Sequence, residues 1–240
     1  MTPLPDEEIK RILVVMAHPD DCDFGAGGTI ANWTAKGIHV SYCIITNGDQ
    51  GGEESDVPLE EMAAVRQKEQ RAAGLALGVK DIVFLNYRDG SLVPTIELRK
   101  EIVREIRRAK PDRMVIQSPE RNYERIFASH PDHMAAGETA IQAVYPDARN
   151  PYAFTDLLDE GFEPVRVKEV WLTGSPTPNH FVDITDTFPK KIAALHAHVS
   201  QTAHNKELEN MVRSWGEKNA EAHGLPAGRI VEIFKVVNTD

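Results

Sequence analysis

The chain has 240 residues, of which 41% are hydrophobic and 27% charged, a composition that suits one large domain with a buried core. A formal net charge of -10 at pH 7 argues against nucleic acid as a partner, because there is no basic surface to neutralise phosphates. Residues 1–8 are acidic and contain prolines, and neither a signal peptide nor a membrane-spanning stretch is apparent. We therefore expect a cytoplasmic protein with one domain, residues 1–240, and no membrane partner.

Apolar runs and helical periodicities alternate along the chain. The expected strands are residues 12–16, 38–46, 81–85, 113–118, 168–173, 181–184 and 230–237. The expected helices are residues 29–36, 59–77, 95–109, 129–145, 186–201 and 206–222. Four strand-helix alternations in a row predict an α/β fold with a Rossmann-like, doubly wound, mostly parallel sheet and helices on both faces. We expect the last strand at an edge of this sheet.

The first informative stretch, Ala17-His18-Pro19-Asp20-Asp21, directly follows the apolar run at residues 12–16. Such a run, ended by an X-Pro step, is typical of a strand buried on both faces, because proline pushes the preceding residue out of the helical region. One imidazole and two carboxylates therefore arrive at the carboxyl end of a central strand, where open α/β sheets bind their ligands. We expect a Gly-rich turn at residues 25–28 to follow.

The second informative stretch, Ser129-His130-Pro131-Asp132-His133, opens the helix after the fourth strand. Ser129, with Asp132 three residues later, resembles a capping box, and proline fits the first turn of a helix. His130 and His133 are three residues apart, so we expect them on one face of that turn.

Two imidazoles and one carboxylate form a metal site with an open position, which is the catalytic arrangement for zinc; the same donors also suit Fe(II). The ligands that we assign are His18, Asp21 and His133. Asp20 is then left to act as a general base on water. His130, oriented by Asp132, is left to stabilise an oxyanion or to protonate a leaving group. These parts fit metal-assisted hydrolysis of an amide or an ester.

Other interpretations of these residues stay open. Adjacent aspartates often cap a helix, and a lone histidine after a strand is often a packed residue. The Gly-rich turn leaves a Rossmann-like nucleotide-binding or sensor protein as one alternative, although its spacing is not G-x-G-x-x-G and the carboxylates would repel a pyrophosphate. A non-haem Fe(II) enzyme with the same ligands is another, but the strand-helix alternation differs from the jelly rolls that usually hold such sites.

Together the two motifs resemble the PIG-L/LmbE-like family of zinc-dependent N-deacetylases, and the resemblance covers most of the chain. The supporting segments are Thr46-Asn47-Gly48-Asp49-Gln50-Gly51, Arg66-x-x-Glu69, Leu77-Gly78-Val79, Asp89-Gly90 and Lys191-x-x-Ala194-Leu195-x-x-His198-x-Ser200-Gln201. The resemblance implies a hydrolase that removes the N-acetyl group from an N-acetylglucosamine-containing small molecule or short saccharide. Its products would be acetate and a free amine.

Compared position by position, the resemblance implies the same roles for these residues as the reasoning from their side-chain chemistry. Zinc ligands match His18, Asp21 and His133; the general base matches Asp20; the oxyanion-stabilising or general-acid histidine matches His130. Arg66 and Asp89 match positions that bind sugar hydroxyls in some members. The alternatives are a surface ion pair between Arg66 and Glu69 and a turn role for Asp89. Asp132 and His198 are candidates for residues that support the metal ligands without binding the metal themselves.

Two positions depart from the family pattern. Asp23 stands where the family often has glutamate, so the groups behind the ligands differ in reach. Ala128 stands where some members have a tyrosine that helps to bind the oxyanion, so either Tyr123 or Arg125 replaces it or the role is absent.

Two loop-like segments have no readable ligand signature. We expect residues 51–58 and 145–164 to shape the substrate pocket, and the second segment could also be a surface insertion or an oligomer contact. As partners, the resemblance implies a small-molecule amino-sugar substrate and a second copy of the chain in a homo-oligomer.

Overall fold

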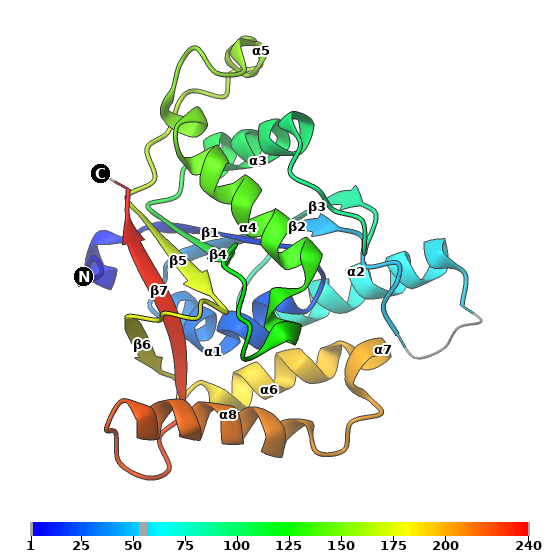
Figure 1. Cartoon of the computed structure of the whole chain (residues 1–240), viewed down its shortest axis with the longest axis vertical. Coiled ribbons are helices and arrows are strands. Elements are labelled where there is room, and N and C mark those ends of the chain that lie inside the picture. The colour runs from blue at the N-terminus through cyan, green and yellow to red at the C-terminus, as the bar shows by residue number, and fades with distance from the viewer. Residues whose placement is uncertain (1, 53–56, 240) are drawn as a thin grey trace.

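The computed structural model describes residues 2–52 and 57–239. Its central sheet has seven strands in the order β3-β2-β1-β4-β5-β7-β6 (Figure 1). The strands are β1 (Arg11–Met16), β2 (His39–Thr46), β3 (Asp81–Tyr87), β4 (Arg113–Gln117), β5 (Glu169–Thr173), β6 (His180–Asp183) and β7 (Val231–Asn238). The first five strands are parallel, and β7 pairs antiparallel with both β5 and β6. The predicted Rossmann-like, mostly parallel α/β sheet is confirmed.

The last strand in the chain does not lie at an edge, so that prediction was wrong. β7 is inserted between β5 and β6, and its Phe234 and Val236 side chains are almost completely buried. The edge is formed by β6, which is short and has no fully buried residue. An alternating apolar pattern cannot distinguish these positions, because the antiparallel partner comes from a distant part of the chain.

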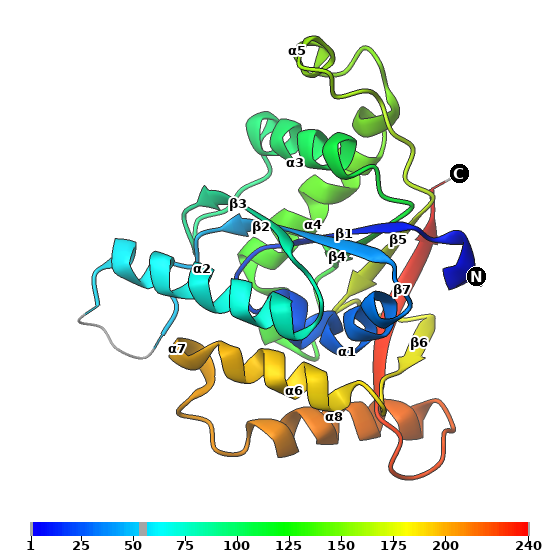
Figure 2. The same cartoon turned by 180° about the vertical axis from the view of Figure 1, so that it is seen from behind.

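Helices cover both faces of the sheet (Figures 1 and 2). The longer ones are α1 (Asp21–Ala35), α2 (Leu59–Ala76), α3 (Ile96–Ala109), α4 (Pro131–Val144), α6 (Phe188–Ala197) and α8 (Leu208–Ala222). The shorter ones are α5 (Thr155–Asp159), α7 (Val199–Thr202), η1 (Asp6–Glu8), η2 (Ile126–Ser129) and η3 (Asp147–Arg149). Helices α3 and α4 lie on one face, while α1, α2 and α6 lie on the other with α8 packed beyond α6. In the described part of the chain, no helix is long and apolar enough to cross a membrane.

The central strand β1 shows why both faces need helices. Ile12, Val14 and Met16 belong to the core under α1 and α2, whereas Leu13 and Val15 belong to the core under α3 and α4. Successive side chains of a strand point to opposite faces, so a continuous apolar run must be buried on both.

Helix α1 begins eight residues earlier than the sequence predicts, and it contains the glycines that we expected in a turn. Gly28 explains their use: a Cβ there would lie 2.6 Å from Ile184 Cδ1. The glycines thus let α1 pack closely against its neighbours instead of breaking the helix.

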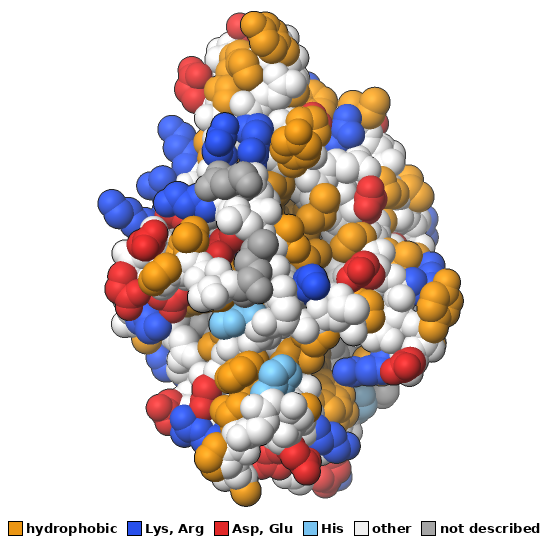
Figure 3. All heavy atoms as spheres, turned by 60° about the vertical axis from the view of Figure 1, so that its left-hand side comes forward, with side chains coloured by type: hydrophobic (Ala, Val, Ile, Leu, Met, Phe, Trp, Pro, Cys, Tyr) orange, Lys and Arg blue, Asp and Glu red, His pale blue; other side chains and the backbone are white. Residues whose placement is uncertain are grey.

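Residues 145–164 project from the body of the molecule (Figure 1). Arg107 of α3 is buried beneath them and donates hydrogen bonds to the carbonyl oxygens of Asp147, Asn150 and Ala153, each at 3.0 Å. On the face shown in Figure 3, lysine and arginine side chains gather under this projection, and acidic side chains gather lower down.

The ends of the chain meet at the amino end of β5. The Leu4 amide donates to Glu169 Oε2 at 2.9 Å, and the Thr239 amide donates to the Lys168 carbonyl at 3.1 Å. Arg113 reinforces this corner, because its guanidinium donates hydrogen bonds to Glu169 Oε1 and the Leu4 carbonyl and lies against the rings of Trp33 and Trp171.

Candidate active site

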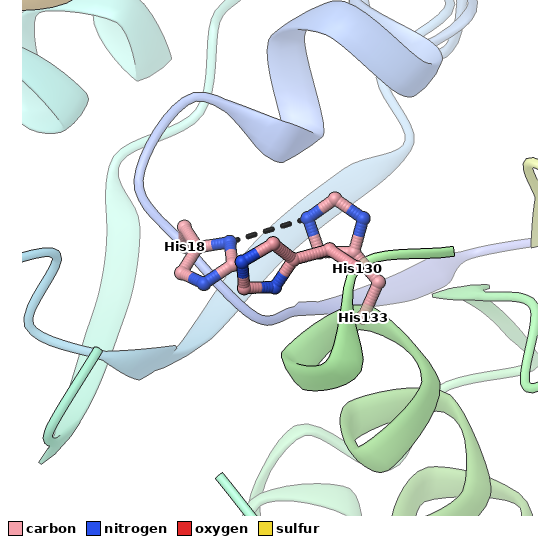
Figure 4. A group of neighbouring side chains, drawn as sticks. All are labelled: His18, His130 and His133. Atoms are coloured by element: carbon pink, nitrogen blue, oxygen red, sulfur yellow. Dashed lines mark hydrogen bonds between the residues drawn. The ribbon is translucent and has the colours of Figure 1, made fainter. Parts of the chain in front are cut away.

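The two predicted motifs meet where the strand order reverses, between β1 and β4. His18 follows the end of β1, and His130 and His133 flank the start of α4, which follows β4. Figure 4 shows the three imidazoles turned toward one another from these two elements. Ligands of open α/β sheets bind at this kind of crevice.

His18, Asp21 and His133 contact one another in a triangle of side chains, in which Asp21 turns one carboxylate oxygen toward each imidazole. His18 Nδ1 lies 3.2 Å from His133 Nε2 and 3.2 Å from Asp21 Oδ2, and His133 Nε2 lies 3.1 Å from Asp21 Oδ1. Tetrahedral zinc ligands at bond lengths of about 2.0–2.2 Å are separated by roughly 3.4 Å. The spacing of the His18 and His133 nitrogens is thus close to that of zinc ligands, and either oxygen of Asp21 could complete the set.

The second nitrogen of His18 faces two carboxylates. Its Nε2 lies 3.1 Å from Asp89 Oδ1 and 3.2 Å from Asp132 Oδ2. Burial opposes the imidazolium, but Asp21, Asp132 and Asp89 together raise the pKa of His18 to about 12 in the metal-free protein. A carboxylate that contacts the non-ligating nitrogen of a metal-binding histidine fixes the tautomer and orientation of its ring. Asp89 and Asp132 can therefore orient His18 so that its Nδ1 faces the metal.

Among the described residues, two groups of side chains each bring one donor atom per residue within 4.8 Å of the others; both include His18, and neither includes Asp21. In one of them, His130 replaces Asp21; in the other, Asp89 and Asp132 replace His133 and Asp21. Asp132 already accepts hydrogen bonds from the Gly90 and Leu92 amides at 2.7 and 3.0 Å, which makes the second set less suited to a cation.

His130 is held by the backbone of α4. Its Nδ1 accepts a hydrogen bond from the Asp132 amide at 3.2 Å, so the neutral ring carries its proton on Nε2. Burial, with the neighbouring His18 and His133 rings, lowers the pKa of His130. The ring is therefore a neutral N–H donor beside the triangle.

This contact replaces two predicted ones. The helix is capped by the His130 ring and not by a Ser129–Asp132 box, because the Asp132 carboxylate is occupied by the amides of another loop. The same carboxylate contacts His18 and not the His130 ring, so Asp132 does not orient His130 as we expected.

Asp20 has an unusual backbone conformation beside the triangle. Its φ of 90° lies in the left-handed region, which costs a non-glycine residue about 1–3 kcal/mol. Two residues of α2 hold it there: Arg66 Nη2 donates to Asp20 Oδ2 at 3.2 Å, and Gln70 Oε1 accepts from the Asp20 amide at 2.7 Å. Burial is the main cause that raises the pKa of Asp20 to about 6.

Arg66 is not on the helix surface. Its side chain is 4% exposed, donates to the Pro19 carbonyl at 2.6 Å, and also reaches Asp89 Oδ2 at 3.5 Å. The alternative ion pair with Glu69 is not formed, since Glu69 accepts from the amide and hydroxyl of Ser200.

A chain of three buried side chains leads away from Asp20, and the sequence analysis predicted only part of it. Gln70 Nε2 donates to Asp23 Oδ2 at 2.9 Å, and His198 Nε2 lies 2.8 Å from the same oxygen. Gln70, Asp23 and His198 are all 0% exposed. His198 is thus connected to Asp20 through three contacts, and Gln70 is the residue that we did not predict. Only its place one helical turn after Arg66 could have suggested it.

A cavity of about 370 Å³ opens beside the triangle, and Asp21 and His133 contribute to its wall. Arg125 and Ala128 line it as well, whereas Tyr123 is 84% exposed and does not. Of the two expected replacements for the tyrosine, Arg125 is therefore the one that faces the cavity.

The two loop segments expected to shape the pocket are tested to different extents. No residue of the projecting segment 145–164 lines it, so that part of the prediction was wrong. Of the loop at residues 51–58, residues 53–56 lie outside the described part of the chain.

The structure disfavours nucleotide binding at the glycines of α1. The Gly28 and Thr29 amides donate to the two carboxylate oxygens of Glu232 at 3.0 and 2.8 Å, and Lys191 Nζ lies 2.6 Å from the same carboxylate. A buried carboxylate therefore occupies the place that a phosphate would need.

The fold and the site together define a Rossmann-like α/β protein with two imidazoles and carboxylates converging at the carboxyl ends of its central strands. The chain belongs to the PIG-L family, because residues 13–144 match the family model described as GlcNAc-PI de-N-acetylase.

Three similar proteins illustrate this membership. A protein of Thermococcus kodakarensis named diacetylchitobiose deacetylase is 37% identical over 82% of this chain and 72% of its own length. A Bacillus anthracis protein named "Probable N-acetyl-alpha-D-glucosaminyl L-malate deacetylase 2" is 30% identical over 81% of this chain and 82% of its own. The structure of N,N'-diacetylchitobiose deacetylase from Pyrococcus horikoshii superposes with a TM-score of 0.89 and 33% identity, covering 98% of this chain and 86% of that one.

Proposed function

We propose that this protein is a zinc-dependent N-deacetylase that hydrolyses the N-acetyl group of an N-acetylglucosamine-containing small molecule or short saccharide. The observation that carries the proposal is the donor triangle of His18, Asp21 and His133 with the Asp20 carboxylate beside it. Membership of the PIG-L family supports the same reaction. We propose further that residues 1–240 act as one domain.

His18, Asp21 and His133 would hold the cation. When bound, a zinc ion supplies Lewis-acid polarisation and makes water more acidic; Fe(II) fits the same donors and stays the alternative.

Asp20 acts as the general base in the proposed reaction. Its carboxylate takes a proton from the water whose oxygen attacks the acetyl carbon, and Arg66 keeps that carboxylate in place. His130 donates its Nε2 proton toward the developing oxyanion or the leaving nitrogen. The C–N bond then breaks, so acetate and a free amine leave.

Asp89 and Arg66 lie 3.5 Å apart, next to His18 and Asp20 respectively, and we propose that they bind hydroxyl groups of the sugar. We propose indirect roles for Asp132 and His198. Asp132 orients His18, and His198 positions Asp23. A homo-oligomer and a cytoplasmic location stay predictions.

The test is acetate release from N-acetylglucosamine, its disaccharide, and its malate and inositol conjugates, with metal-stripped and zinc-reloaded protein compared. We expect release only with metal, and a loss of about 10²–10⁴-fold in kcat for Asp20→Asn with its metal content unchanged. No release from any substrate by protein with verified metal would refute the deacetylase function. Full turnover by Asp20→Asn would refute the base assignment.

A further inference from the structure

Gln117 is the last residue of β4, and its side-chain amide has only one possible orientation. The amide oxygen, Oε1, accepts a hydrogen bond from the Ala17 backbone amide at 2.9 Å. Because a backbone N–H needs an acceptor, the amide nitrogen Nε2 cannot take this place. The side chain is 6% exposed, so its Nε2–H₂ group is held in a fixed direction.

The two hydrogens of Gln117 Nε2 are not used by the protein. Within the described part of the chain, Nε2 has no hydrogen-bond partner, and Gln117 lines the cavity of about 370 Å³ together with Asp21 and His133. In contrast, the hydroxyl groups of Thr173 and Ser175, which line the same cavity, both donate to other groups of the protein. The Nε2–H₂ group is therefore a donor that is available to a ligand.

Gln117 lies between the two segments that carry the histidine ligands. Its partner Ala17 directly precedes His18. On α4, Gly137 follows His133 by about one helical turn, and a Cβ at Gly137 would lie 2.3 Å from the Gln117 carbonyl oxygen. The end of β4 thus touches both segments.

The segment that carries the third ligand approaches the same place. Gly25 follows Asp21 by about one turn of α1, and a Cβ at Gly25 would lie 3.3 Å from Thr173 Cγ2. Thr173 is the residue of β5 that pairs with Gln117. All three ligand segments therefore converge around Gln117, and the substrate atoms that react at the ligands are the natural partners of its Nε2–H₂ group.

The acyl oxygen of the substrate is the acceptor that suits this donor. When water adds to the acetyl carbon, this oxygen becomes negatively charged, and donors that are already fixed in place stabilise the charge. The N–H group of the substrate amide cannot accept a hydrogen bond. The sugar hydroxyls are assigned to Arg66 and Asp89, which do not line the cavity.

Arg125 also lines the cavity, but it is a less suitable donor for the oxyanion. Its side chain is exposed, and its guanidinium lies over the Phe127 ring, 4.9 Å from the ring centroid. Binding through such a long and exposed side chain costs conformational entropy, whereas the amide of Gln117 is already immobilised. Gln117 is therefore the better replacement for the tyrosine that is missing at Ala128.

We propose that Gln117 is a catalytic residue whose Nε2–H₂ group donates a hydrogen bond to the acyl oxygen as the tetrahedral intermediate forms. No proton is transferred, and the amide acts beside the proposed donor His130. This inference rests on the proposed function. It extends the site to the end of β4, which neither of the two histidine motifs contains.

Two substitutions separate this role from support of the Ala17 backbone. Gln117→Glu keeps an oxygen that accepts from the Ala17 amide but has no N–H to donate, whereas Gln117→Met loses both functions at a similar length. With metal content unchanged, we expect kcat for acetate release to fall about 10²-fold in both variants, with KM changed less than about threefold. Gln142→Glu makes the same change on α4 outside the cavity, and this matched control should keep the wild-type kcat.

The pattern of activities decides between the two roles. An active Gln117→Glu protein beside an impaired Gln117→Met protein would show that Gln117 only supports the backbone, and would overturn the inference. Wild-type kcat in both variants would overturn it as well. No acetate release by wild-type protein with verified metal would refute the proposed function, and the inference with it.

A second test measures binding without turnover. The methylphosphonamidate of glucosamine, whose tetrahedral phosphorus carries a charged oxygen, is titrated into the metal-loaded wild type and both Gln117 variants. We expect its Kd to rise about 10²-fold in both variants, while glucosamine, which has no acyl oxygen, binds all three proteins equally. Equal binding of the phosphonamidate by all three proteins would overturn the inference, even if the variants release acetate more slowly.

Discussion

Gln70 holds the backbone of Asp20 in a conformation that this residue would not adopt alone. Its two amide atoms are both used, one on the Asp20 amide and one on Asp23. Because the left-handed φ of Asp20 costs about 1–3 kcal/mol, the carboxylate should shift when this support is removed.

We therefore expect Gln70→Met, which keeps the size of the side chain but removes its hydrogen bonds, to lower kcat about 10- to 100-fold with metal content unchanged. Gln67→Met is the matched control, since Gln67 lies on the same helix and bonds only to the exposed Asn86. Steady-state kinetics and metal analysis of both variants are the measurements. Equal activity of the two variants would contradict this role.

The raised pKa of Asp20 also affects the stability of the metal-free protein. Burial raises this pKa to about 6, above the value near 3.9 of an unfolded chain, so the folded state binds the proton more tightly. Stability is therefore lost as pH rises from about 4 to about 6. We expect metal-free Asp20→Asn to be more stable than metal-free wild type above pH 6, with the difference fading toward pH 4. Urea unfolding across this range is the measurement, and a difference that grows toward low pH would show the opposite sign.

At the residue scale, the sequence predicts the groups that act within one turn of a motif. His18, Asp21 and His133 are found together because two short motifs follow adjacent parallel strands. Gln70 could not be found this way, since it reaches Asp20 across 50 positions of sequence. The Ser129 cap failed for the same reason, because amides of a distant loop compete for the Asp132 carboxylate.

At the scale of elements, close packing explains why glycines stand inside helices, which helix propensity alone would not predict. Helix α4, which carries His133, crosses the end of β4 at Gly137, where a Cβ would lie 2.3 Å from the Gln117 carbonyl oxygen and 3.0 Å from the Pro119 nitrogen. Both are backbone atoms, which cannot swing away. At Gly28, where we expected a turn, helix α1 instead packs against the side chain of Ile184, and glycine leaves room for it.

For Gly137→Ala we expect a loss of about 1–3 kcal/mol in the free energy of unfolding, although alanine has the higher helix propensity by up to about 1 kcal/mol. Urea denaturation measures the change. Glu138→Ala, at the next and exposed position, is the control for propensity alone and should change stability by less than about 0.5 kcal/mol. A more stable Gly137→Ala protein would show that the helix can move away from β4.

At the scale of the whole molecule, the site gathers acidic groups that repel one another without a cation. Asp20 contacts Arg66, Asp21 and Asp132 contact His18, and Asp89 contacts both, in a chain that already carries a net charge of -10. A bound cation would offset this repulsion in the folded state only.

We expect zinc at 100 times its dissociation constant to stabilise the protein by about 2.7 kcal/mol and to raise its melting temperature by roughly 5–10 °C. Thermal unfolding with and without zinc measures the shift, and His133→Ala should abolish most of it. A shift of equal size in His133→Ala would place the cation elsewhere.

The corner at the amino end of β5 has a practical consequence. Leu4 and Thr239 are anchored there to neighbouring residues, Glu169 and Lys168, while the catalytic crevice opens at the carboxyl ends of the strands. A short linker could join these two anchored ends in a circular permutant. Attachment of the protein to a solid support through the same corner would leave the crevice facing the solution, so an immobilised form should accept substrate as freely as the dissolved one.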